Sequence, residues 1–145
     1  MDKLTYVRME DENDTDIEKL TEIYQTPDTA RYISISDNYF HYVTNTENVY
    51  FYKVYENGTL IGATHLEKQD DVLFMDILVF TEFQGMGYGT RIIKDIQDDI
   101  FGLCYKTIEV YIDASNYASK KLFMKSNFDF VSEEDELMKF VYRKD

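Results

Sequence analysis

The chain contains few of the residues that mark disulfide-rich, fibrous or low-complexity proteins. Its 145 residues include one cysteine, one proline, six glycines and no tryptophan. A single cysteine, Cys104, excludes an internal disulfide framework, and we expect it to be a small buried residue. With only Pro27 and no Gly/Ser-rich stretch, the sequence indicates no interdomain linker, so we expect a single domain over residues 1–145.

Positive charge and long apolar runs are also scarce. The chain has 15 basic and 28 acidic residues and a net charge of −13. This balance argues against nucleic acid as a partner and favours a cationic one. No apolar run approaches the ~18 residues of a membrane span, and the N-terminal segment turns acidic where a signal peptide would be apolar. We therefore expect a cytoplasmic protein that has no membrane partner.

Hydrophobic periodicity predicts strands alternating with amphipathic helices. The predicted strands cover residues 4–9, 49–56, 59–67, 73–80, 107–112, 128–132 and 137–142. One helix should follow a capping box at Thr15-x-x-Glu18, a second should run from Gly87 or Tyr88 to Phe101, and a third should be capped by Ser115 or Asn116. Residues 26–44 fit a short helix and loops, and Asn57-Gly58 predicts a type I′ turn. This order predicts an α+β fold, a mixed α/β sandwich.

Three of the six glycines lie around the start of the predicted second helix, ahead of its stripe of isoleucines. An apolar strand runs into Gln84, and Gly85, Gly87 and Gly89 follow on alternate positions. Glycines at this spacing leave backbone N–H groups uncovered, and the positive end of the next helix points to the same place. The segment therefore predicts a site for a phosphate or pyrophosphate. The stripe, which we expect to be buried, consists of Ile92, Ile93, Ile96 and Ile100.

Three known phosphate-loop patterns compete for this segment. A dinucleotide fingerprint requires G-x-G-x-x-G, but Thr90 stands where the third glycine belongs and no βαβ unit precedes it. A Walker loop requires G-K-[ST], which does not follow these glycines. The third pattern, Q-x-x-G-x-G, is matched by Gln84, Gly87 and Gly89. In this context it resembles the acetyl-CoA loop of the GNAT superfamily of N-acetyltransferases.

Two further stretches extend the resemblance. The family's approach to the loop, V-x-P-E-[YF]-[QR], is similar to Val79-x-Thr81-Glu82-Phe83-Gln84. Its later motif, N-x-x-A-x-x-L-Y-x-K-x-G-F, is similar to Asn116-x-x-Ser119-x-x-Leu122-Phe123-x-Lys125-x-Asn127-Phe128. The resemblance implies a central, mostly antiparallel sheet of about six to seven strands, flanked by about four helices and splayed between the fourth and fifth strands.

The resemblance also implies that acetyl-CoA is the co-substrate and that no metal is used. The pantetheine arm would pair with the end of the fourth strand, and loop amides would hold the pyrophosphate. The implied cofactor-binding residues are Ile77, Leu78, Val79, Gln84, Gly85, Met86, Gly87, Tyr88, Gly89, Thr90, Asn116, Ser119, Lys121 and Phe123. Main-chain contacts of this kind explain how so acidic a chain binds CoA, with Arg91, Lys120 and Lys121 placed to add positive charge.

The reaction implied is direct attack of a primary amine on the thioester in a ternary complex. Only the neutral amine attacks, so a base must take a proton from the ammonium group. Asp76, the one charged residue in the strand LFMDILVF, and Glu109 are the candidate bases, with Glu67 and His65 behind them. In this family a backbone amide, here that of Val79 or its neighbour, steadies the tetrahedral oxyanion.

The chain departs from the family at the residue that usually protonates the leaving thiolate. Phe123 occupies the place of a tyrosine and has no proton to donate. A thiol pKa near 8.5 makes the CoA thiolate a tolerable leaving group without help, and Tyr111 or Tyr117 could substitute as the acid. This departure keeps open a second function, a non-catalytic acyl-CoA-binding module for sensing or assembly. Dinucleotide binding is a third candidate function.

The acceptor is expected to be a small-molecule or peptide amine. Tyr24, Tyr32 and Tyr39 lie in or beside the weakly structured first half, which covers the acceptor site in this family. Aromatic faces with nearby carboxylates suit a cation. The oligomeric state stays open, with a homodimer as one option because dimers are common among relatives.

Overall fold

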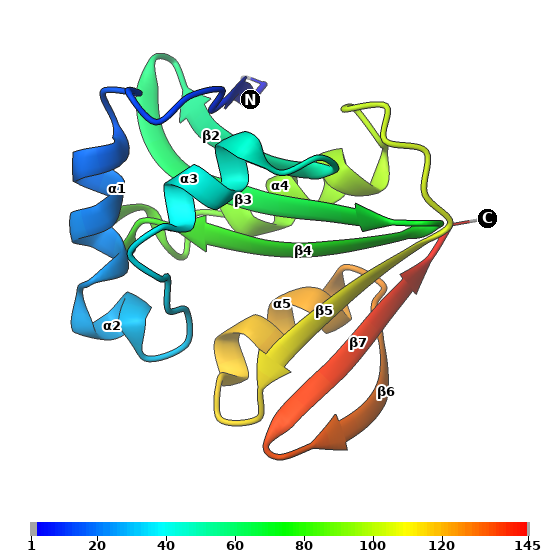
Figure 1. The fold of residues 1–145 in the computed structure, drawn as a ribbon. Helices are drawn as coiled ribbons and strands as arrows, with labels where there is room; N and C mark the ends of the chain where they lie inside the picture. Colours follow the sequence, from blue (N-terminus) through cyan, green and yellow to red (C-terminus); the bar gives the residue numbers. More distant parts are fainter. Residues whose placement is uncertain (1–2, 145) are drawn as a thin grey trace.

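The computed structural model describes residues 3–144, and its framework is one seven-stranded sheet (Figure 1). The strands are β1 (Thr5–Arg8), β2 (Val49–Glu56), β3 (Thr59–Gln69), β4 (Val72–Val79), β5 (Thr107–Asp113), β6 (Asp129–Glu134) and β7 (Leu137–Arg143). Their order across the sheet is β1-β2-β3-β4-β5-β7-β6. Only the β4–β5 pair is parallel, so the predicted mixed and mostly antiparallel sheet is confirmed.

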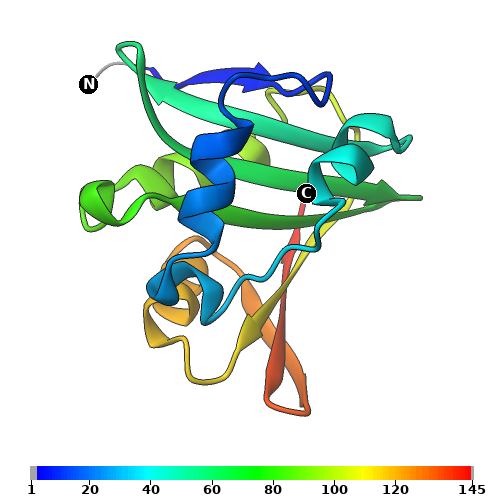
Figure 2. The same cartoon turned by 60° about the vertical axis from the view of Figure 1, so that its left-hand side comes forward.

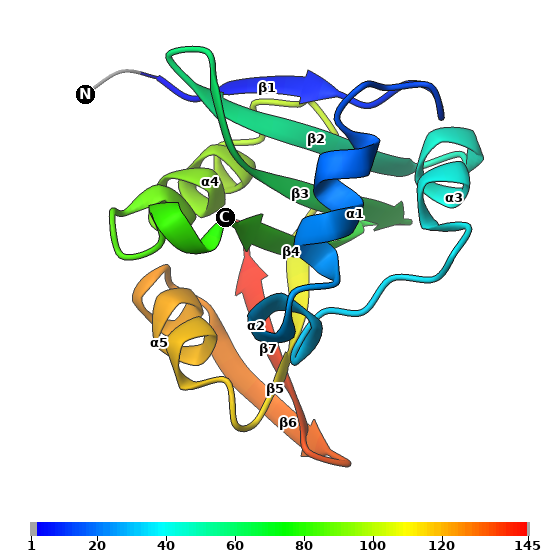
Figure 3. The same ribbon diagram turned by 90° about the vertical axis from the view of Figure 1, so that its left-hand side faces the viewer.

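Helices cover both faces of the sheet (Figure 3). They are α1 (Ile17–Tyr24), α2 (Pro27–Ala30), α3 (Tyr39–Asn45), the 3₁₀ turn η1 (Thr81–Phe83), α4 (Tyr88–Gln97) and α5 (Tyr117–Lys125). Buried side chains of α4 and α5 belong to one apolar core, and those of α1 and α3 belong to a second core on the opposite face. The sheet is therefore the middle layer of three.

The central β4–β5 pair separates along its length (Figures 1 and 2). Pairing joins Val72, Leu73 and Phe74 to the first three residues of β5 and then stops. Beyond Phe74 the two strands diverge, and β3 stays paired with β4 up to Val79. The splay expected between the fourth and fifth strands is therefore present.

Two sequence-based expectations about turns and caps have different outcomes. Asn57 has φ 49° and Gly58 has φ 79°, as a type I′ hairpin turn requires. The predicted capping box is wrong. Helix α1 begins at Ile17 without a side-chain cap, and Asp16 at its N-cap binds the ammonium group of the buried Lys53 instead, at 2.9 Å.

The α4 helix is shorter than the periodicity predicted. It ends at Gln97, and Ile100, expected in its buried stripe, is 51% exposed. The reason is a left-handed backbone at Asp99 (φ 51°), whose carboxylate accepts hydrogen bonds from the Leu103 and Cys104 amides at 2.8 and 3.0 Å. One of these amides belongs to Cys104, which is exposed rather than buried as expected.

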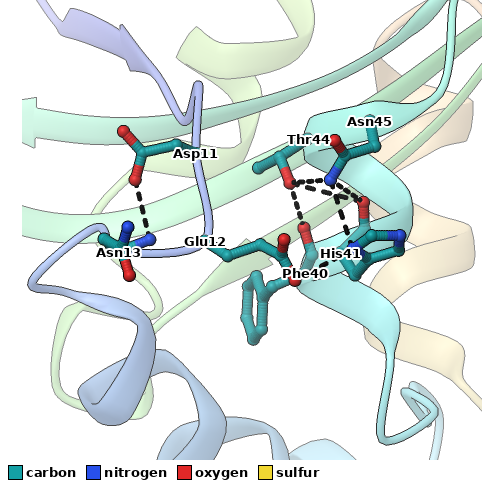
Figure 4. Close-up of polar contacts among 7 residues, drawn as sticks. All are labelled: Asp11, Glu12, Asn13, Phe40, His41, Thr44 and Asn45. Carbon is teal, nitrogen blue, oxygen red and sulfur yellow. Dashed lines mark hydrogen bonds and ion pairs between the residues drawn. The ribbon is translucent and has the colours of Figure 1, made fainter.

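Polar contacts fix α3 beside the loop that follows β1 (Figure 4). The His41 ring approaches the Glu12 carboxylate at 3.0 Å, and the Asn45 amide donates to the His41 carbonyl at 2.9 Å. On its other side α3 buries Phe40 and Val43 in the second core. Helix α3 is thereby held over the face of the sheet that carries Asp76.

Candidate functional site

A cleft of about 650 Å³ opens where β4 and β5 separate. Its walls come from both strands, from the glycine loop with the start of α4, from α5 and from the α2 segment. Most of the predicted cofactor-binding residues line it: Ile77, Leu78, Val79, Gln84, Gly85, Gly87, Tyr88, Gly89, Thr90, Asn116, Ser119 and Phe123. Met86 and Lys121 do not, and Met86 is 60% exposed.

The glycine loop presents unoccupied backbone donors. Gly85 and Gly87 have φ of 76° and 86°, the left-handed region that favours glycine. Within residues 3–144, the amides of residues 85–90 have no hydrogen-bond acceptor, and the series resumes with Arg91, whose amide donates to the Gly87 carbonyl at 3.1 Å. Several N–H groups at the positive end of the ten-residue α4 helix are thus available to an anion.

Close packing holds this helix end against the second motif. A Cβ on Gly89 would lie 2.9 Å from a methyl group of Leu122. The Asn116 side chain caps α5 by accepting the Ser119 amide at 3.2 Å, as predicted. Both sides of the cleft are therefore positioned by short local contacts.

Two of the three basic residues expected to add positive charge around the loop already have partners. Arg91 forms an ion pair with Glu56 at 2.6 Å, and the Tyr88 hydroxyl also bonds to this carboxylate. The Lys120 ammonium donates to the Ala114 carbonyl at 2.7 Å. Of these residues, only Arg91 is paired with a carboxylate within residues 3–144.

The end of β4 exposes its main chain to the cleft. The Phe80 amide donates to the Ile61 carbonyl at 3.0 Å. Hydrogen-bonded and non-bonded positions alternate in an antiparallel pair, so the Val79 and Ile77 amides point away from β3, toward the gap. The Gln84 side chain donates to the Val79 carbonyl at 3.0 Å, an interaction that the sequence did not reveal. The Val79 N–H is left directed into the cleft.

Asp76 lies at the base of the splay, on the face covered by α1 and α3. It has accessible surface because it lines the cleft, yet protein atoms crowd its carboxyl group. This enclosure raises the pKa of the Asp76 carboxyl, His65 opposes the shift, and Glu67 adds to it. No residue among 3–144 donates a hydrogen bond to the carboxylate. Asp76 is thus a carboxylate with a raised proton affinity and, within residues 3–144, no hydrogen-bond donor.

The other predicted proton carriers are placed less favourably for that role. Glu109 is held by the Lys139 ammonium at 3.0 Å and by the Tyr111 hydroxyl at 3.1 Å. Tyr111 lines the cleft, and its pKa is raised by partial burial and by the Glu109 carboxylate. Tyr117 is 74% exposed and lies outside the cleft lining.

The three tyrosines predicted to meet the acceptor separate in the structure. Tyr32 lines the cleft, and its hydroxyl donates to the Ser115 carbonyl at 3.3 Å. Tyr24 is buried beneath, and Tyr39 bonds to the His65 ring at 2.6 Å. Burial raises the pKa of both Tyr24 and Tyr39, so they are neutral. Tyr24 and Tyr39 support the cleft wall and Tyr32 belongs to it.

Sequence reasoning missed a second cavity of about 260 Å³ next to the cleft. Met75, Asp76 and Tyr111 line both spaces, and the remaining walls are His65, Glu67, Phe74 and Glu109. Its residues come from three strands, and only their register brings them together. The chain that the structure describes, residues 3–144, has no helix long and apolar enough to cross a membrane.

Comparisons with known proteins agree with this geometry. The model of the acetyltransferase (GNAT) family matches residues 15–128, whereas a sequence comparison with curated proteins gave no match. A domain from Methanocaldococcus jannaschii superposes with a TM-score of 0.82 at 18% identity, over 97% of this chain and 98% of that one.

Two solved structures with bound ligands are also similar. Campylobacter jejuni N-acetyltransferase PseH in complex with acetyl coenzyme A gives a TM-score of 0.78 at 14% identity, over 98% and 99% of the two chains. An aminoglycoside acetyltransferase in complex with coenzyme A gives 0.79 at 18% identity, over 98% and 95%. At these identities the structures show a shared fold, and the family model matches most of the chain. The chain belongs to the GNAT family of acetyltransferases.

Proposed function

We propose that this protein is an N-acetyltransferase that transfers the acetyl group of acetyl-CoA to a primary amine by direct attack in a ternary complex, within a single domain. The observation that carries the proposal is the row of unoccupied amides at residues 85–90, directly after a strand whose inner edge is open. Relatives of the same fold have been solved with acetyl coenzyme A or coenzyme A.

The two parts of CoA match two parts of the cleft. The pyrophosphate accepts hydrogen bonds from the loop amides at the positive end of α4. These local donors offset the repulsion that the protein's net charge of −13 exerts on the pyrophosphate. The pantetheine arm carries amides of its own, and these pair with the main chain of Ile77, which lacks a neighbouring strand beyond Phe74. The Val79 carbonyl accepts from Gln84, so its N–H stays available for the thioester carbonyl. Backbone groups thus bind the co-substrate.

Asp76 is the proposed base. The incoming amine arrives protonated and must lose a proton before it attacks the thioester carbonyl. A carboxylate with a raised pKa and no hydrogen-bond donor among residues 3–144 is suited to accept that proton, directly or through one water. Glu109 is a poorer candidate because it already neutralises Lys139.

Val79 and the leaving thiolate complete the reaction. Attack of the neutral amine forms the C–N bond and places negative charge on the carbonyl oxygen, which the Val79 N–H stabilises. Collapse of the intermediate breaks the C–S bond, releases the CoA thiolate and gives the amide, whose nitrogen loses its remaining extra proton to water. With Phe123 packed at 5.1 Å against Phe128 in place of an acid, we propose that the thiolate leaves unprotonated.

The test is to incubate the purified protein with acetyl-CoA and a panel of primary amines while free thiol is measured. Thiol release above background that depends on an amine supports the enzyme. Binding of CoA without release across a broad panel would instead support the acyl-CoA-binding module that Phe123 keeps open. Indifference to CoA together with binding of NAD would refute both.

A further inference from the structure

The second cavity continues the cleft on the acceptor side. It shares Asp76 with the cleft and lies on the face of the sheet that carries α3. An amine that reaches Asp76 from this side brings the rest of its molecule into the second cavity. The side chains that line the second cavity therefore indicate which groups the acceptor carries besides the reacting nitrogen.

Register fixes the shape of the cavity. Glu67 on β3 is paired with Phe74 on β4, and Phe74 is paired with Glu109 on β5. The two glutamates therefore flank Phe74 on one face, with Cα atoms separated by two strand spacings, about 10 Å. Asp76 lies two residues farther along β4 on the same face, about 7 Å toward the glycine loop.

The cavity carries more negative than positive charge. The charged and titratable side chains that line it are His65, Glu67, Asp76, Glu109 and Tyr111. Lys139 neutralises Glu109 at 3.0 Å, and Glu67 is held by the His65 ring and the Tyr42 hydroxyl, each at 2.8 Å. Apart from the His65 ring, no basic side chain among residues 3–144 pairs with Glu67 or Asp76.

The walls between these carboxylates suit an aliphatic cation. The rings of Phe74 and Tyr111 lie nearly parallel, with an interplanar angle of 16° and centroids 6.5 Å apart. Aromatic faces attract ammonium groups and also pack against methylene chains. The side chains of His65 and Glu67 are only 13% and 26% exposed, so a charge bound beside them is partly desolvated.

We propose that the acceptor is an aliphatic diamine or polyamine, whose second ammonium group is held by Glu67 and the neighbouring carboxylates while the first is acetylated beside Asp76. This inference rests on the proposed function. The two nitrogens would lie about 7 Å apart, the distance from Asp76 to the Glu67–Phe74–Glu109 row. A carboxylate beside the second ammonium would be repelled, so free lysine is a poorer ligand than the matching diamine.

The test compares three ligands with the same five-carbon chain, titrated by calorimetry into CoA-saturated protein. They are 1,5-diaminopentane, 1-aminopentane, which lacks the second amine, and lysine, which adds a carboxylate beside it. Against the monoamine, the diamine should bind on the order of tenfold more tightly, because it adds one partly desolvated ion pair. Lysine should bind more weakly than the diamine. Equal affinity of the diamine and the monoamine would overturn the inference without any variant.

A matched pair of variants locates the effect. Glu67→Gln should reduce the preference for the diamine to about threefold or less. Glu133→Gln, on the exposed strand β6, removes the same charge and should leave the preference unchanged. An unaltered preference in Glu67→Gln overturns the assignment.

Thiol release measured in parallel separates the two proposals. Diamine preference without thiol release, here and across the broad amine panel, supports this site and refutes the transferase. Thiol release without diamine preference supports the transferase and refutes this site.

Discussion

Replacing Gly87 with alanine tests the backbone cradle with little steric disturbance. Gly87 has φ 86°, and a Cβ built on it meets no atom within 4 Å. Alanine therefore adds no clash, and its only penalty is the left-handed conformation, about 1–2 kcal/mol. Gly58 in the β2–β3 hairpin is a matched control, with φ 79° and equally open space but no place in the cleft.

The two variants should divide this penalty differently. The amides of the Gly87 loop have no acceptor within residues 3–144, so the loop of the variant can leave the left-handed conformation and relieve the strain. CoA binding must then restore that conformation, which costs binding free energy. Its CoA dissociation constant should rise about fivefold to thirtyfold, since 1.4 kcal/mol corresponds to tenfold. The hairpin turn is tied into the sheet, so Gly58→Ala should lower the melting temperature by about 4 °C per kcal/mol and leave CoA affinity unchanged.

Calorimetry with CoA and thermal melting by circular dichroism measure the two quantities. The strain must appear in one of them. A Gly87→Ala protein that equals the wild type in both affinity and melting temperature would refute the reasoning. A weaker CoA affinity in Gly58→Ala would show that the loop is not the specific determinant.

Three further changes test the rest of the site. Asp76→Asn should lower kcat/KM by at least about 100-fold. Because the fold raises the pKa of Asp76, ionisation of this carboxyl at higher pH destabilises the folded protein. The variant should therefore unfold at a higher urea concentration than the wild type at neutral pH, and unfolding at a lower concentration would contradict the sign of the effect. Gly62→Ala would place a Cβ 2.1 Å from the Leu78 carbonyl oxygen and force β3 from β4, for an expected loss of about 3 kcal/mol and a fall in melting temperature of roughly 10 °C. Tyr111→Phe, which removes the hydroxyl bonded to Glu109, should keep kcat within about threefold if the thiolate leaves unprotonated, and a loss near 100-fold would identify Tyr111 as the acid.

The parts of the fold that the sequence predicted are those set by local pattern. Alternating apolar residues and the Asn57-Gly58 turn specify the β2–β3 hairpin within a few residues. The segment between α1 and β2 was harder, because helices of four and seven residues are not stable alone. Helix α3 exists because Phe40 packs in the second core beside Phe51, at 5.7 Å between ring centroids, a contact that no local pattern reveals.

The same division applies to the site. Glycine spacing predicted uncovered N–H groups, and the amides of residues 85–90 have no hydrogen-bond acceptor within residues 3–144. It did not predict that Lys139, thirty residues along the chain, would neutralise Glu109, because that ion pair depends on the β5–β7 register. The second cavity was missed for the same reason, as it combines side chains from β3, β4 and β5.

The short pairing between β4 and β5 would allow the proposed co-substrate to stabilise the fold. Two interior strands end their pairing after three residues, and the main chain beyond Phe74 is left to solvent. A ligand that forms hydrogen bonds between the separated ends of β4 and β5 would connect the two parts of the sheet, which pair with each other only at the start of these strands. At a hundred times its dissociation constant such a ligand adds about 2.7 kcal/mol to the stability. Amide exchange along β4 and β5 should therefore slow when CoA is present, and a cell depleted of the coenzyme would hold a looser and more rapidly degraded protein.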